Sequence, residues 1–251
     1  MTSASSPTPL RIYQSTIGKK LLTGITGLGL ALFVLVHMVG NLTLFFSAAA
    51  YNQFGHIVET LGPLTWSIEL LLLGFVLLHA VLGVQIFIGK LKARDSQYAT
   101  YQSTNQASPP SSNQPSDLAA QSSSYQSLSS RSMIWTGLLM AAFLIWHLTT
   151  FKFGPRYLIP NTNVRDLARL VFEKFHQPSY TSGYALIMVL VGVHLRHGLW
   201  SALQSLGLLD KRVRPWVYTL GTGLAVLTAL GFLGLPVAIY AGWLGGHSSA
   251  F

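Results

Sequence analysis

Residues 21–46, LLTGITGLGLALFVLVHMVGNLTLFF, carry a single titratable side chain, His37, in a stretch of apolar and small residues. An apolar run of about 20 residues is long enough to cross a hydrocarbon core of about 30 Å as a helix. A titratable residue inside such a span is costly and is usually functional. This stretch therefore predicts a membrane helix that carries a functional histidine.

Four more apolar runs of similar length follow, at 66–89, 133–151, 180–209 and 216–244. His79, His147 and His194 each lie in a different one of the first three. Half of the 251 residues are hydrophobic, only 9% are charged, and the mean hydropathy is +0.45. The first run is too long for the apolar part of a cleaved signal peptide. We therefore expect an all-α membrane protein, in which residues 1–251 form a single domain with five transmembrane helices.

The lysines and arginines predict the orientation of these helices. With the N-terminus in the cytoplasm, ten of them flank the spans on that side and five lie on the other, all of those in one loop. The flanks of the spans account for most of the net charge of +9. We therefore expect no nucleic-acid partner and a multi-pass protein in a bacterial cytoplasmic membrane, with the C-terminus outside.

Two connections between the spans have distinct compositions. Residues 95–130 are rich in Ser, Gln and Pro, and such low complexity predicts a cytoplasmic loop without a core. Residues 164–175, VRDLARLVFEKF, repeat apolar side chains at a helical period and predict a short amphipathic helix on the outer surface. The chain has no cysteine, so any iron–sulfur chemistry must belong to a partner.

The four histidines can be compared by their depth in the membrane. At a rise of about 1.5 Å per residue, His37 and His147 lie about 8–14 Å from the outer ends of their helices. By the same rise, His79 and His194 lie about 20 Å from those ends. The histidines therefore form two levels, and each level could hold one iron between imidazoles from two helices. A hydrogen-bonded structural role or a proton relay is the alternative.

Small residues near the ligands would give a flat haem room to approach a helix. Gly40 follows His37 by three residues, and Gly83 and Gly198 follow their histidines by four. Small residues also simply let membrane helices pack closely. The glycines alone therefore do not distinguish a haem site from helix packing.

Four segments together carry a specific resemblance: STIGKKLLTGITGLGLALFVLVHMVGNLTLF, WSIELLLLGFVLLHAVLGV, SSRSMIWTGLLMAAFLIWHLTTFKFGP and VGVHLRHGLWSALQSLGL. They resemble the cytochrome b558 family, the five-helix membrane subunits of succinate dehydrogenases and fumarate reductases. The resemblance covers the first four spans, and the 95–130 segment is longer and richer in Ser than is usual for the family. It implies a bundle that encloses two stacked b haems and exchanges electrons with a quinone, either menaquinone or ubiquinone.

The resemblance also implies roles for the histidines. His37 and His147 stand at the axial positions of the distal haem, and His79 and His194 at those of the haem proximal to the iron–sulfur partner. It implies a flavoprotein and an iron–sulfur subunit on the cytoplasmic side. Succinate is oxidised on the flavoprotein, so this chain holds no catalytic residue for that step and is the membrane subunit of the enzyme complex.

Three further residues have weaker indications. His197 is a rival to His194 as a ligand, and we prefer His194 because it matches the family motif. Arg196 and His197 are candidates for the haem edge or its propionates, although an Arg in a span can equally pair with another helix. Glu69, inside the second span, is a candidate proton carrier for a quinone near the distal haem; the alternative is an interfacial carboxylate paired with Lys152 or Arg156.

Two other function classes fit parts of this pattern. A dihaem cytochrome b of another quinone-linked dehydrogenase would use similar histidines. A transporter or channel with a histidine proton relay would contain no haem and would be colourless.

Overall fold

The computed structural model describes residues 15–105 and 117–244, with side chains described outside residues 93–131. This part of the chain is helical and contains no strand, apart from one isolated bridge between Leu158 and Arg165. The α-helices are α2 (Thr16–Leu42), α3 (Ala48–Thr60), α4 (Pro63–Asn105), α5 (Asp117–His147), α6 (Leu167–Phe175), α7 (Pro178–Ser205) and α8 (Arg214–Tyr240). A 3₁₀ turn, η1 (Thr43–Phe45), follows α2, and a π-helical turn, η2 (Leu148–Lys152), follows α5.

Five helices of the described chain are long and apolar enough to cross a membrane, and they confirm the five predicted spans. They cover Thr16–Phe45, Pro63–Lys92, Ser132–Lys152, Pro178–Ser205 and Arg214–Tyr240. Their ends follow local chemistry: Ser15 caps α2 by accepting from the Gly18 N–H at 2.9 Å, and α7 and α8 each have a proline in the first turn, where no intrahelical N–H is needed. The fold is all-α and multi-pass, as expected.

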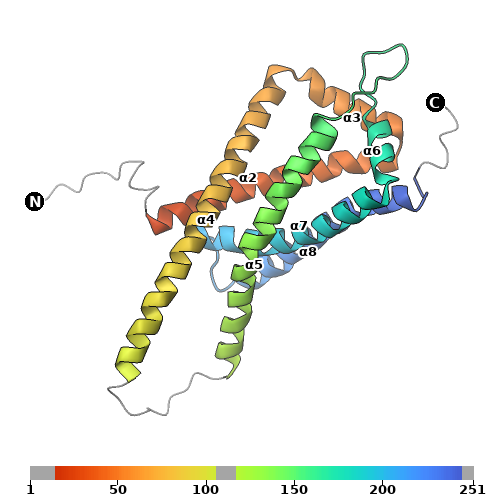
Figure 1. Ribbon diagram of the computed structural model, residues 1–251. Coiled ribbons are helices and arrows are strands. Elements are labelled where there is room, and N and C mark those ends of the chain that lie inside the picture. The colour runs from red at the N-terminus through yellow and green to blue at the C-terminus, as the bar shows by residue number, and fades with distance from the viewer. Residues whose placement is uncertain (1–14, 106–116, 245–251) are drawn as a thin grey trace, which may run out of the picture.

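The spans are packed unevenly around the bundle (Figure 1). α7 and α8 lie against each other, and α2 packs on both of them and on α4. α5 packs on α7, whereas α4 and α5 scarcely touch over the described residues. Instead of a filled core, this arrangement leaves a cavity between α2, α4, α5 and α7.

One end of the bundle, where α2 and α5 end, is covered by α3 and α6. The amphipathic helix predicted within 164–175 is present as α6, but its apolar face packs against α3, α7 and α8 and not on lipid. Val171 and Phe175 belong to a buried cluster with Tyr51 of α3 and Tyr184 of α7. α3 was not predicted from the sequence; it is a short helix, and its packing partner α6 lies far along the chain.

A buried polar contact joins α3 to α6. The Asn52 amide donates to Asp166 Oδ1 at 2.9 Å, and its oxygen accepts from the Ala168 N–H at 2.8 Å. Asn52 and Asp166 are only 5% and 6% exposed. This pair fixes the position of the covering helices over the bundle.

The prediction of a loop over 95–130 is wrong for most of that segment. α4 continues as a helix to Asn105 and α5 begins at Asp117, while residues 106–116 lie outside the described residues. No glycine or proline occurs between Gly89 and Pro109, so nothing local ends the helix that leaves the membrane. A composition poor in apolar residues predicts the absence of a core, but it does not prevent a span from extending as a helix.

Candidate cofactor site between paired histidines

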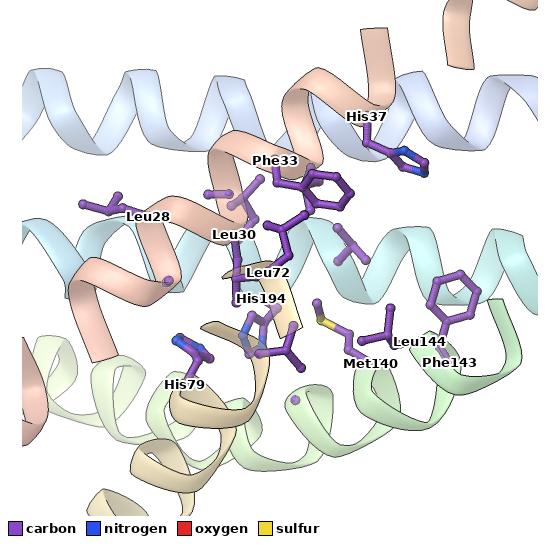
Figure 2. Close-up of a pocket in the computed structure, with 18 of the residues that line it drawn as sticks. Leu28, Leu30, Phe33, His37, Leu72, His79, Met140, Phe143, Leu144 and His194 are labelled. Carbon is purple, nitrogen blue, oxygen red and sulfur yellow. The ribbon is translucent and has the colours of Figure 1, made fainter. Parts of the chain in front are cut away.

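The four membrane histidines lie in two pairs. The ring centroids of His37 and His147 are 5.8 Å apart, and those of His79 and His194 are 6.4 Å apart. Figure 2 shows His79 and His194 close together, with His37 separated from them along the bundle. This arrangement confirms the pairing predicted from depth, and each pair joins two helices, α2 with α5 and α4 with α7.

All four histidines line one large cavity. Its volume is about 2480 Å³, whereas most small-molecule sites measure about 300–1,000 Å³. Its walls are mainly apolar and include the side chains labelled in Figure 2, namely Leu28, Leu30, Phe33, Leu72, Met140, Phe143 and Leu144. The space is therefore sufficient for more than one large apolar ligand, with imidazoles at two depths.

Glycines of the neighbouring helices α2 and α5 lie beside His79 and His194. A Cβ added at Gly27 of α2 would lie 2.9 Å from His79 Cε1, and one at Gly137 of α5 would lie 3.6 Å from His194 Cε1. Gly27 lets α2 approach the His79 ring, whereas a Cβ at Gly137 would make an ordinary van der Waals contact with His194. Neither Gly27 nor Gly137 could be identified from the sequence, because which side of α2 or α5 faces the rings depends on how each helix is rotated.

The three glycines identified from sequence have different surroundings. Gly83 and Gly198 line the cavity, and a Cβ there would meet nothing within 4 Å, which is consistent with room for a ligand. Gly40 differs, because a Cβ there would be 2.4 Å from Phe54 Cε1. Phe54 of α3 thus fills the space beside Gly40.

The Nδ1 atoms of three histidines have polar partners. His79 Nδ1 is 3.1 Å from the Thr23 carbonyl oxygen, His194 Nδ1 is 2.9 Å from Thr136 Oγ1, and His147 Nδ1 is 3.2 Å from the Tyr184 hydroxyl. A carbonyl oxygen only accepts, so Nδ1 of His79 carries the proton and its Nε2 has the free lone pair. Metal-binding histidines are oriented in this way by a partner on the other ring nitrogen.

His147 stands where α5 changes into the π-helical turn η2. The Thr149 hydroxyl donates to the Ile145 carbonyl at 2.9 Å, and the Phe153 N–H donates to the Leu148 carbonyl at 2.9 Å, five residues back. Gly154 is needed there, because a Cβ would lie 1.9 Å from the Thr150 carbonyl oxygen. Such turns are frequent at functional positions.

The ring separation of both pairs is compatible with one metal held between two imidazoles. Metal–nitrogen bonds of about 2 Å would put the centroids of two opposed imidazoles about 6 Å apart, close to the observed 5.8 and 6.4 Å. The described residues contain no group of three or more His, Asp or Glu able to hold an ion by themselves. A pair of imidazoles is therefore suited to a group that supplies its own remaining metal ligands, as haem does.

Arg196 and His197 also line the cavity, next to His194 in the sequence. The Arg196 guanidinium lies over the Tyr218 ring at 5.1 Å, contacts the Tyr218 hydroxyl, and donates from Nε to Thr222 Oγ1 at 3.3 Å. These contacts with α8 match the alternative to a haem contact, in which the arginine pairs with another helix. The ring beside His79 belongs to His194, and a role for Arg196 or His197 at a haem edge stays a prediction.

Glu69 lines the cavity and forms an ion pair with Lys152. The Lys152 ammonium is also 5.5 Å from the centroid of the Trp66 ring. The side chains of Lys152 and Glu69 are 40% and 35% exposed, so the ion pair is only partly buried. Glu69 has the contact expected of the structural alternative and also borders the cavity, and its role in proton transfer stays a prediction.

No protein-family model, curated protein or solved structure matches this chain. The resemblance to the cytochrome b558 family therefore rests on the residues of the chain itself.

Proposed function

We propose that this chain is the dihaem cytochrome b membrane subunit of a succinate:quinone oxidoreductase. The observation that carries the proposal is the presence of two histidine pairs at two depths in one apolar cavity, with ring separations suited to axial ligation. The family resemblance adds the partners, a flavoprotein and an iron–sulfur protein on the cytoplasmic side, and the substrate, a membrane quinone.

In this function, haem supplies one-electron transfer when it is bound. His79 and His194 hold the inner position, nearer the iron–sulfur partner, and His37 and His147 hold the outer one. The partners on Nδ1 orient the imidazoles, and the apolar walls exclude water, two of the means by which a protein sets a haem potential. Glu69 at the outer end of the cavity exchanges protons with a quinone.

The first experiment is a reduced-minus-oxidised optical spectrum with pyridine haemochrome quantification on the purified full chain, expressed with sufficient haem. Two b haems per chain are expected. One haem would contradict the assignment of one pair, and a colourless protein would overturn the proposal in favour of a histidine relay. Purification of the native complex tests the partners, because a copurified iron–sulfur protein without a flavoprotein that oxidises succinate would indicate a different quinone-linked dehydrogenase.

A further inference from the structure

Thr136 of α5 lies directly behind the ring of His194. Its Oγ1 atom is 2.9 Å from His194 Nδ1, and the two residues belong to different helices. The threonine is only 7% exposed, so water does not compete effectively for this contact. The contact is therefore a buried link between α5 and the ring of a candidate ligand on α7.

The direction of this hydrogen bond follows from the other contacts of the threonine. Its hydroxyl is 3.1 Å from the Ser132 carbonyl and 3.2 Å from the Met133 carbonyl, and these oxygens can only accept. The single hydroxyl proton is directed at them, so Oγ1 accepts from the His194 ring. Nδ1 of His194 then carries the proton, and Nε2 keeps the lone pair.

Thr136 is not among the residues that line the cavity, whereas its neighbour Gly137 is. A ligand in the cavity therefore touches His194 without touching the threonine. Any effect of Thr136 on that ligand must pass through the imidazole.

We propose that Thr136 is a positioning residue, which holds His194 in the tautomer with a free Nε2 and turns that atom toward a metal shared with His79. This inference rests on the proposed function. Donation from Nδ1–H makes an imidazole a stronger electron donor to iron, and such a donor stabilises the ferric state. Loss of the acceptor therefore raises the midpoint potential of the haem that His194 holds.

The test compares Thr136→Val, which removes the acceptor at nearly constant volume, with Thr136→Ser, which keeps it. Thr228→Val is the matched control: Thr228 is fully buried in α8 and donates to the Leu224 carbonyl at 2.7 Å, but it does not line the cavity. The three variants and the wild type are compared as purified full chains by redox titration of both haems and by haem retention during dilution.

Thr136→Val is expected to raise the potential of one haem, leave the other unchanged, and weaken retention of the first by about 10–100-fold. Thr136→Ser and Thr228→Val should behave like the wild type. Unchanged potentials in Thr136→Val would overturn the inference, as would equal effects of Val and Ser at position 136.

A second measurement separates this inference from the proposed function. Nitrogen-15 NMR of the His194 ring in the haem-free chain reports the tautomer directly. We expect Nδ1 to be protonated in the wild type and in Thr136→Ser, and mixed tautomers in Thr136→Val. A chain that binds no haem but shows this pattern would refute the proposed function and retain the role of Thr136 as a positioning residue, whereas mixed tautomers in the wild type would refute that role.

Discussion

Replacing either histidine of one pair with alanine is expected to remove the same haem. Under the proposed function, one iron would lie between the imidazoles of each pair, whose ring centroids are 5.8 and 6.4 Å apart, so each ring would supply half of its axial ligands. His79→Ala and His194→Ala should each reduce the haem content from two per chain to one, with the same residual spectrum. His37→Ala and His147→Ala should leave the other haem.

Double substitutions give the sharper result. His79→Ala with His194→Ala should still retain one haem, because both changes empty the same position. His79→Ala with His147→Ala should retain none, because the two residues belong to different pairs. The assay is pyridine haemochrome per chain on protein that elutes as a single species in detergent, and His197→Ala is the control that should keep both haems.

If the variant lacking both His79 and His194 contains no haem while the variant lacking both His79 and His147 contains one, the rings that share an iron are not those that lie together in the structure. If His197→Ala loses a haem and His194→Ala does not, the ligand on α7 is His197.

Two further substitutions test the end of the bundle that α3 and α6 cover. Asn52→Leu removes the amide between α3 and α6. The Ala168 N–H loses its acceptor, whereas Asp166 Oδ1 keeps the Arg169 N–H; at about 1–3 kcal/mol for one unsatisfied buried group, stability should fall by about 2 kcal/mol. Thermal unfolding in detergent should show a lower midpoint, and an unchanged midpoint would contradict the role of the amide. Glu69→Gln should lower quinone turnover while both haems remain, and Glu59→Gln, which affects a carboxylate 3.5 Å from Arg156, is the matched control. Normal turnover in Glu69→Gln would limit that residue to its ion pair.

The spans and the histidine pairs were predictable from the sequence because lipid imposes simple rules. A span must be apolar over a fixed length, and the constant rise of a helix converts a residue number into a depth. The spans 66–89 and 133–151 differ from the structural ones by only a few residues. The pairing of His37 with His147 needed no knowledge of the side-chain directions.

The remaining features depend on helix rotation and on contacts between distant segments. Gly27 and Thr136 contact histidines 52 and 58 residues away, and no local pattern specifies which side of α2 or α5 faces those rings. The same limit explains why the sequence could not distinguish haem approach from helix packing at Gly40, where Phe54 fills the space beside it. The extension of α4 to Asn105 was missed because Ser and Gln were interpreted as loop residues, although they are compatible with a continuing helix.

The sparse contact between α4 and α5 affects how the protein can be made in a cell. Membrane helices gain nothing from hiding apolar surface from water, so they associate through close packing and polar contacts. In this bundle α4 is held by α2, and α5 by α7, with little direct packing between α4 and α5. Under the proposed function, the two haems complete this interior, so haem supply should limit how much subunit accumulates. Chains made during haem shortage would be substrates for membrane quality-control proteases.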